Sequence, residues 1–494
     1  MNQPTAVIWP WDYFHHLHTS GKLLQWISDN PDGASARTTQ YWEHCKHLDF
    51  FQRVGLPEDK FGSCVPLYFH TDGVKVYKNQ KAWVYSVSSA CRKGPSMSTK
   101  LAFILVRDAT VVKRKTHDAI GKLAGYIVDT LMSGCFPEKD FQGNLFPPGS
   151  LASARAGQPF AHGWMMAFAA FKGDWEARVV VHKLTRYYRS TFICEHCLAS
   201  YRDDLTFADF RVDANSQQLR FSHDQFLALN PQHDQSSWTS VRGWTKDRNL
   251  EEPLISKDLL HVFHQGVLCC VIAGLICSHI ESQNPLVTLN QLDTFLSKNV
   301  YKHYKRWCHA KGKFASACSH RFNAIRFGKE QWAQYCELGS VYKAAVVKSM
   351  LFWCNDFLKE HVGRVHGSEA RARCIHSFAK FQFLLDSHGP FFTGEQTTQV
   401  VKYARAGLLF YQDLVAEDRA RVDGRRFYKM IPKFHSLFEM AIYIEQTNRN
   451  VRYEHCYQDE DLMKEIGKIA SMTHPSTMDM VTLRRYRAVL ELCS

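Results

Sequence analysis

The sequence lacks the features that mark secreted and membrane-spanning chains. Its first residues, MNQPTAVIWPWDYFHHLH, contain no basic region followed by an apolar run, so no signal peptide is expected. The longest apolar run, GVLCCVIAGLIC at 266–277, is too short to span a bilayer and predicts a buried helix. No internal repeat or low-complexity segment is present, which argues against a solenoid. A membrane is therefore not expected as a partner.

Acidic charge is scarce relative to basic charge. The 494 residues include 61 Lys and Arg against 48 Asp and Glu, a formal net charge of +13. This excess favours a polyanionic partner; of the two classes, nucleic acid and an acidic membrane surface, we expect nucleic acid. The 16 cysteines are irregularly spaced and follow no secretory signal, which indicates reduced thiols in the cytosol or nucleus.

Three strands are predicted early in the chain, rich in β-branched and aromatic residues. They are VPLYFHTDGVKVY at 65–77, KAWVYSVSSA at 81–90 and STKLAFILVRDATVV at 98–112. A helix is predicted at 116–134 from its apolar spacing. The apolar run GWMMAFAAFKGD at 163–174 is typical of a buried strand that ends in an acid.

The second half of the chain is predicted to be mostly helical. Almost all of 258–445 has helical periodicity, NVRYEHCY at 450–457 predicts a strand, and DEDLMKEIGKIASM at 459–472 predicts a helix. Three strands, a helix and a fourth strand are, by analogy, the front half of a ribonuclease H-like fold. The predicted fold class is mixed α/β: a ribonuclease H-like catalytic domain with a large, mostly α-helical insertion. The predicted segments are a helical lead-in (1–60), the first part of the catalytic domain (61–190), a Cys-pair loop region (191–257), the insertion (258–445) and the C-terminal part of the catalytic domain (446–494).

Two aspartates fall at predicted strand edges, Asp72 in HTDG and Asp174 in KGDWEA. Acids this far apart in sequence can meet only if their strands are neighbours in one sheet. Mg²⁺ takes oxygen ligands, and two-metal phosphodiester chemistry needs carboxylates that bridge the ions. The alternative is that each Asp is a turn residue beside a glycine.

A cysteine pair, Cys194-x-x-Cys197, has the spacing that lets two thiolates share one Zn²⁺. No second CxxC is present, so the remaining ligands are open. The histidines at 182, 196, 223 and 233 and the cysteines beyond 260 are candidates. An unmetallated buried pair and a redox motif are the alternatives.

Two further features carry charge. Asp258 and His261 lie three residues apart and are expected on one face of a helix, where they would support a metal site or hold DNA. Basic clusters with interleaved aromatic residues occur at 111–117, 301–313 and 419–429. Such clusters suit phosphate contacts and base stacking, although solvated helix faces look the same.

The order of these motifs resembles the catalytic core of eukaryotic cut-and-paste DDE/D transposases, most of all the CACTA-type superfamily. In that core a GD-aromatic-x-A segment precedes a Cys pair, and D-x-x-H follows on a helix. The resemblance implies Asp72 and Asp174 as the first two acids, with Cys194 and Cys197 as the pair and Asp258 and His261 as the motif. IPKFHSLFEMA at 431–441 is similar to a late lysine-histidine segment of that core.

The third acid is open at this stage. Glu460, at the start of a predicted helix, has the expected context, while Asp459, Asp461 and Glu439 are rivals. No N-terminal DNA-binding domain is evident in residues 1–60, so a fragment, a domesticated derivative or an inactive relic is also compatible.

The sequence therefore predicts a nuclear, DNA-binding nuclease and strand transferase in which Asp72, Asp174 and Glu460 hold two Mg²⁺ or Mn²⁺ ions. Zn²⁺ at the Cys pair would brace the loop after the second acid. A homo-oligomer is compatible with this class. The alternatives are a catalytically inactive, domesticated DNA- or chromatin-binding protein and an RNA-processing factor with the same fold.

Overall fold

The structure is a computed structural model that describes residues 5–77, 80–92, 94–112, 115–211, 213–244, 255–285, 287–312, 314–318 and 320–493. The chain divides into two compact units. Unit 1 comprises Met1–Thr185, Phe221–Asp258 and Tyr453–Ser494, and unit 2 comprises Arg186–Arg220 and Leu259–Arg452. Unit 2 is thus made of two excursions of the chain out of unit 1.

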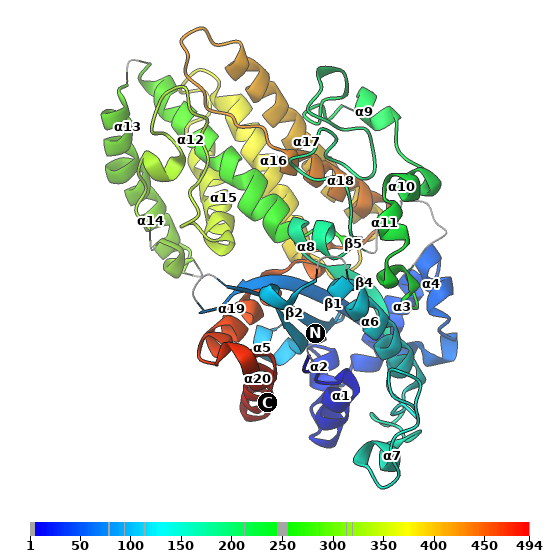
Figure 1. Cartoon of the computed structure of the whole chain (residues 1–494). Helices are drawn as coiled ribbons and strands as arrows, with labels where there is room; N and C mark the ends of the chain where they lie inside the picture. The colour runs from blue at the N-terminus through cyan, green and yellow to red at the C-terminus, as the bar shows by residue number, and fades with distance from the viewer. Residues whose placement is uncertain are drawn as a thin grey trace. The chain divides into compact units, whose positions relative to one another are not determined.

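Unit 1 contains a mixed five-stranded sheet in the order β3-β2-β1-β4-β5 (Figure 1). β1, β2 and β3 form an antiparallel meander, whereas β4 is parallel to β1 and the two-residue β5 is parallel to β4. Their bounds are β1 Cys64–Lys75, β2 Lys81–Ser89, β3 Lys100–Arg107, β4 Met165–Lys172 and β5 Ile255–Ser256. The four strands predicted between 65 and 174 are confirmed, as is the mixed α/β class.

The strands form where the sequence predicts them because most of their residues are buried. β2, β3 and β4 expose no residue, in keeping with continuous runs of apolar and β-branched side chains. Alternation divides β1 and β4 between two faces. Phe69 and Phe171 lie on one face, and His70 and Lys172 on the other.

Helices of unit 1 pack against this sheet. The long helix α6, Lys115–Ser133, contacts β4, which confirms the helix predicted at 116–134. α19 (Tyr457–Ser471) contacts β1, and α20 (Met478–Cys493) contacts β3. The remaining helical segments of unit 1 are α1 Pro10–Thr19, α2 Leu23–Ile27, α3 Ala34–Cys45, α4 Asp49–Val54, η1 Glu58–Ser63, α5 Ser96–Thr99, η3 Asp108–Thr110, α7 Leu151–Arg155, α8 Trp175–Val180, α10 His223–Leu229, α11 Pro231–Asp234, η5 Ser237–Ser240 and η11 Pro475–Thr477.

The strand predicted at 450–457 is wrong. Val451–Tyr453 forms the 3₁₀ helix η10, and α19 begins four residues later. Asn450 explains the difference, because its side chain donates to the carbonyl oxygens of Leu385 and Gly389 at 2.9 and 3.0 Å. These long-range bonds fix the segment as an irregular link, which the local pattern could not reveal.

Unit 2 is helical. A π-helix, η6 (Leu260–Val267), continues into α12 (Leu268–Gln283), and every residue of α12 up to Glu281 is buried. By length and composition Leu260–Gln283 could cross a membrane, but 89% of its most apolar stretch is buried inside the structure. It is the core helix of unit 2, as the run at 266–277 predicts. Around it lie η4 Asp203–Leu205, α9 Asn215–Gln218, α13 Leu289–Phe295, η7 Leu296–Val300, α14 Tyr301–Ala310, η8 Ala315–Cys318, η9 Ile325–Phe327, α15 Ala344–Lys359, α16 Ser368–Ser387, α17 Gly394–Arg419 and α18 Pro432–Thr447.

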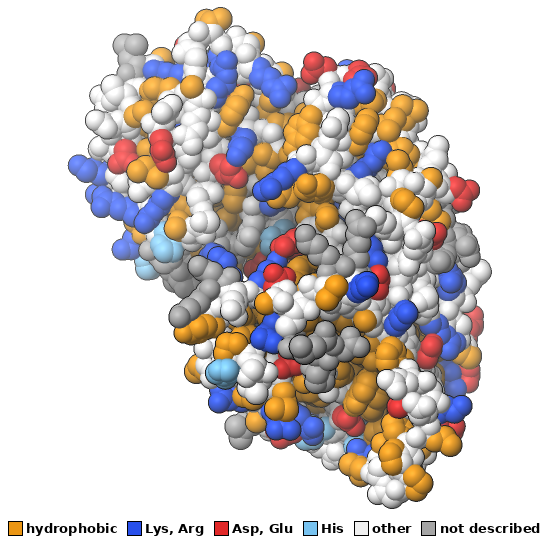
Figure 2. All heavy atoms as spheres, viewed as in Figure 1, with side chains coloured by type: hydrophobic (Ala, Val, Ile, Leu, Met, Phe, Trp, Pro, Cys, Tyr) orange, Lys and Arg blue, Asp and Glu red, His pale blue; other side chains and the backbone are white. Residues whose placement is uncertain are grey.

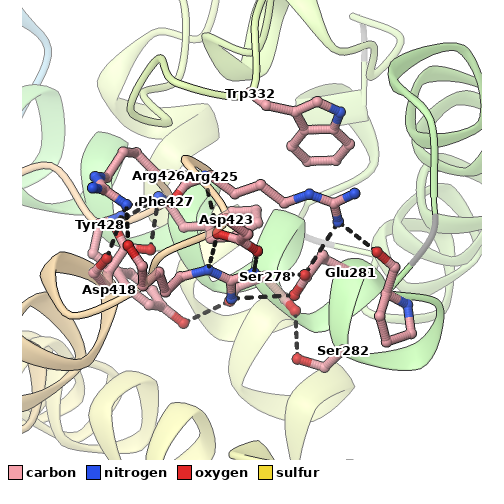
Figure 3. A network of polar contacts seen from close by, with 12 residues as sticks. Ser278, Glu281, Ser282, Trp332, Asp418, Asp423, Arg425, Arg426, Phe427 and Tyr428 are labelled. Carbon is pink, nitrogen blue, oxygen red and sulfur yellow. Dashed lines mark hydrogen bonds and ion pairs between the residues drawn. The ribbon is translucent and has the colours of Figure 1, made fainter.

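An ion-pair network fastens the segment after α17 to α12 (Figure 3). Arg421 and Arg425 both donate to Glu281, at 2.7 and 3.2 Å, and Arg425 also lies over the ring of Trp332. The carboxylate of Asp418 accepts the backbone N–H of Phe427 at 2.9 Å. The basic cluster at 419–429, predicted as a DNA contact, is therefore largely engaged inside unit 2.

Candidate functional site

An aspartate stands two residues beyond the last paired position that each of the three parallel strands shares with its neighbour. Lys172 of β4 pairs with His70 of β1 on one side and with Ser256 of β5 on the other. Two residues beyond these three partners stand Asp72, Asp174 and Asp258. Since the strands run in one direction, equal register brings the three acids to the same edge of the sheet.

Asp72 remains within β1, beyond the last residue that pairs with β4. It is half-buried, and its carboxylate accepts the backbone N–H of Gly73 at 2.6 Å. A Cβ on Gly73 would lie 1.6 Å from Cε of Lys81, whose ammonium pairs with Glu176 at 2.6 Å. Glycine at this position lets the Lys81 side chain cross β1 beside Asp72.

Asp174 follows β4 and caps α8. Its Oδ1 accepts the backbone N–H of Ala177 at 2.8 Å, and the side chain is half-buried. A Cβ on Gly173 would lie 2.8 Å from Cβ of Ala177 and 3.4 Å from the carbonyl oxygen of Thr71. Glycine therefore lets the ends of β1 and β4 approach each other.

Asp258 lies in the link after β5, where the chain leaves unit 1. It is 3% exposed, and its Oδ1 accepts the backbone N–H of Cys456 at 2.9 Å. The expectation that Asp258 and His261 share one helix face is wrong, because Asp258 precedes the helix.

The thiol of Cys456 lies in a buried, acidic environment. Burial raises the pKa of its thiol well above the usual range, and the nearby charges of Asp258, Asp459 and Asp72 raise that pKa further. Of these acids, Asp258 contacts Cys456 directly, through the bond to its backbone N–H.

Asp459 is the most deeply buried acid of this region, and two lysines neutralise it. Its carboxylate contacts Nζ of Lys172 at 2.7 Å and Nζ of Lys100 at 3.2 Å. Burial by itself would raise the pKa of Asp459, but the two ammonium groups outweigh it and hold that pKa well below the usual range. Burial lowers the pKa of Lys100 to about 8, while the pull of Asp459 overcomes burial and raises that of Lys172.

These contacts narrow the choice of a third acid. Asp459 is engaged by lysines, Asp461 is exposed, and Glu439 lies in unit 2 beside the cysteine pair. Glu460, half-buried in the first turn of α19, keeps the context predicted for it. α19 lies close to β1, since a Cβ on Gly467 would be 2.8 Å from Cγ2 of Val74.

We call Asp72, Asp174 and Glu460 the acid edge. These acids suit Mg²⁺ or Mn²⁺, whereas a neighbouring group of possible ligands does not fit a cation. The carboxylates of Asp72, Asp174 and Glu460 are oxygen donors of the type that Mg²⁺ and Mn²⁺ take. Among the described residues, the ligand atoms of His70, Cys456 and Asp459 lie within 4.8 Å of one another, whereas Asp72, Asp174 and Glu460 do not form such a group. The group that contains Asp459 does not fit a cation, because Lys100 and Lys172 already hold the Asp459 carboxylate.

The cysteine pair has a more complete ligand set. Cys194, Cys197, His435 and Glu439 are all buried, and their ligand atoms lie within 4.8 Å of one another. Nε2 of His435 is 3.3 Å from Sγ of Cys197 and 3.4 Å from Oε1 of Glu439. Ligand atoms of a tetrahedral Zn²⁺ are roughly 3.3–3.8 Å apart, as bond lengths of 2.0–2.3 Å require.

The surroundings of the cysteine pair favour thiolates. The backbone N–H groups of His196 and Ala199 donate to Sγ of Cys194 and Cys197, at 3.3 and 3.4 Å. Arg186 donates to the carbonyl oxygens of both cysteines at 3.0 and 2.9 Å. Arg220 binds both carboxylate oxygens of Glu439, at 3.0 and 2.9 Å, which fixes the orientation of that ligand. The residues present therefore fit Zn²⁺.

The structure identifies partners that local spacing did not. Of the predicted candidates, His182 and His233 lie in unit 1, where the ring of His182 stacks on Trp244 and Nδ1 of His233 contacts the carbonyl oxygen of His182. The side chain of His223 lies outside the described residues. His435 stands 238 residues after Cys197, in the segment that carries the resemblance, which was the only available signal.

The second predicted basic cluster is exposed. On α14 and the turn before it, Lys298, Lys302, Lys305, Arg306 and His309 are all exposed at helical spacing. Figure 2 shows Lys and Arg side chains gathered over this helix. We call these five residues the α14 stripe. In the cluster at 111–117, Lys113 and Arg114 lie outside the described residues.

Comparison with known proteins adds no family. No family model matches the chain, and no curated protein matches it.

Proposed function

We propose that the chain is a transposase-like nuclease and strand transferase that acts on DNA through two divalent metal ions. The observation that carries the proposal is that Asp72 and Asp174 each stand two residues beyond the last pair, His70 and Lys172, of two adjacent parallel strands. A meander of three strands, α6 and a parallel fourth strand beside β1 supports a ribonuclease H-like core. In such a core the third acid comes from a late helix, which is the context of Glu460.

The residues of the acid edge would divide the chemistry as follows. Asp72 and Asp174 would bind the ions, and Glu460 would complete their coordination from α19. Bound Mg²⁺ or Mn²⁺ supplies an activated oxygen nucleophile and stabilises the leaving oxygen of the phosphodiester. The same acids serve strand cleavage by water and then joining by the freed 3′-hydroxyl, since both reactions place an oxygen nucleophile opposite a leaving oxygen.

DNA would be held by the α14 stripe. Its four Lys and Arg side chains project from one helix, and a phosphate backbone is the partner for which such a stripe has the right charge and spacing. Trp307 on the same helix is half-buried and stacks on Phe314. With DNA as the proposed partner, the proposed location is the nucleus.

Zinc would have a structural part. A Zn²⁺ ion held by Cys194, Cys197, His435 and Glu439 would clamp the loop of 186–220 onto α18. None of these four residues belongs to the acid edge, so zinc would act on the fold of unit 2.

The test is nicking of supercoiled plasmid DNA in Mn²⁺ by the full chain and its variants. Asp72→Ala, Asp174→Ala and Glu460→Gln are expected to lose nicking by about 10³-fold or more while keeping DNA affinity in EDTA, because each removes a metal ligand. Asp461→Asn, an exposed acid next to Glu460, is the matched control and should nick normally. Nicking by Asp72→Ala and Asp174→Ala at the wild-type rate would contradict the proposal.

A second candidate is a catalytically inactive, domesticated DNA- or chromatin-binding protein. The observation that favours it is the local bonding of the two acids: Asp174 caps α8 and Asp72 accepts the N–H of Gly73. Both hydrogen bonds are common for an aspartate in a turn. Wild-type chain that binds DNA but does not nick it in Mn²⁺ would favour this candidate.

A further inference from the structure

The third strand-edge aspartate, Asp258, occupies a position that neither the metal ligands nor the basic surface explains. It stands where the chain leaves unit 1, and it binds the residue directly before α19 after the chain has returned. The hydrogen bond between Asp258 Oδ1 and Cys456 N, 2.9 Å long, spans 198 residues of sequence and is buried. It therefore closes unit 1 across the whole helical excursion.

We propose that Asp258 is a positioning residue that fixes the N-terminus of α19, and with it Glu460, relative to the strand-end acids Asp72 and Asp174. This inference rests on the proposed function of Glu460. Cys456 is the N-cap of α19, and Glu460 makes the first-turn bond to its carbonyl oxygen at 2.8 Å. The hydrogen bond from the Cys456 amide to Asp258 therefore helps to fix the position of Glu460 relative to the ends of the strands.

A second anchor on the same helix supports this assignment. Asp459, adjacent to Glu460, is held by Lys172 from the end of β4 and by Lys100 from the start of β3. The helix is thus fixed at one point to the sheet and at another to the link after β5. Two anchors restrict both the rotation and the translation of its first turn, and a catalytic carboxylate needs placement to within about 0.5 Å.

The geometry separates positioning from metal binding. Asp258 uses a carboxylate oxygen to accept a backbone N–H, and the amide oxygen of asparagine can accept the same bond. A metal ligand, in contrast, depends on negative charge. Asp258→Asn should therefore behave as wild type where Asp72→Asn does not.

The first experiment measures amide hydrogen exchange of the peptide that covers 456–463 in the full chain. Asp258→Ala is expected to speed exchange by roughly tenfold or more, since it removes a charged acceptor, and Asp258→Asn should stay within about threefold of wild type. This readout does not depend on cleavage. Unchanged exchange in Asp258→Ala would overturn the inference even if the proposed function holds.

The second experiment measures Mn²⁺-dependent nicking. Asp258→Ala should lower the rate by about 10- to 100-fold, as the loss of an orienting partner does, and should shift the Mn²⁺ dependence to higher concentration. Asp258→Asn should restore both. If Asp258→Asn is as inactive as Asp72→Asn while its exchange matches wild type, Asp258 is a metal ligand and the positioning role is wrong. If wild type does not nick, the proposed function fails, and the exchange experiment alone decides the anchor.

Discussion

Asp459→Asn removes the one carboxylate that two buried ammonium groups share. The exposed fractions of the side chains are 0% for Asp459, 1% for Lys172 and 5% for Lys100. Removing one partner of a buried ion pair typically costs 3–5 kcal/mol, because the charge left behind keeps its desolvation penalty. Lys100 relieves part of this cost, since burial has already lowered its pKa to about 8 and it can lose its proton.

We therefore expect Asp459→Asn to lower the free energy of unfolding of unit 1 by about 3–5 kcal/mol. Lys172→Met should cost more than Lys100→Met, because Lys172 makes the shorter contact with Asp459 and Lys100 is closer to neutrality. The assay is urea unfolding at pH 7 combined with hydrogen exchange of β1 and α19, which reports unit 1 separately from unit 2.

Asp461→Asn is the matched control on the same helix. Its side chain is exposed, so its effect should stay within about 0.5 kcal/mol. A loss below about 1 kcal/mol in Asp459→Asn would refute the reasoning, because the carboxylate would then not be the shared counter-charge of the two lysines.

Three further predictions address other parts of the molecule. The purified chain should carry about one Zn²⁺ by mass spectrometry, lost in Cys197→Ser and His435→Ala and kept in Cys135→Ser; zinc retained in the first two would contradict the site. Replacing the four Lys and Arg of the α14 stripe with Gln should reduce the slope of log affinity against log salt by up to about 3–4 units, whereas Gln at Lys380 and Lys402 should leave it nearly unchanged. Stability should fall on acidification, because burial lowers the pKa of His117 to about 4 and its buried Nε2 has no hydrogen-bond partner among the described residues. The unfolded state takes up this proton first, so the stability is complete above about pH 6.5 and is lost as pH falls toward 4, by about 2 kcal/mol at pH 5. His117→Gln should flatten that dependence and His47→Gln should not.

The strands and the two strand-end acids were accessible from sequence because their signals are local. β1 and β4 are long, buried and rich in apolar residues, and an aspartate after such a run stands out. Their adjacency followed only by analogy, since pairing between β1 and β4 is a contact across about 100 residues. Strand β5, which precedes Asp258, has only two residues and could not be predicted from the sequence pattern.

The features that sequence reasoning missed depend on long-range contacts. His435 joins a cysteine pair 238 residues earlier, and no spacing rule connects them. The segment 450–457 has the composition of a strand, yet Asn450 is bound to carbonyl oxygens more than 60 residues away. Asp459 and Glu460 are neighbours with equal local context, and only the lysines on β3 and β4 distinguish the buried ion pair of Asp459 from the half-buried candidate ligand Glu460.

The central claim is that Asp72 and Asp174 form one metal site with Glu460. Anomalous diffraction from crystals of the full chain soaked in Mn²⁺ tests it most directly. We expect Mn²⁺ between the carboxylates of Asp72 and Asp174, with two ions about 3.5–4 Å apart when a DNA end is bound. Crystals in which Mn²⁺ is absent from this edge, with those carboxylates more than about 8 Å apart, would contradict the account.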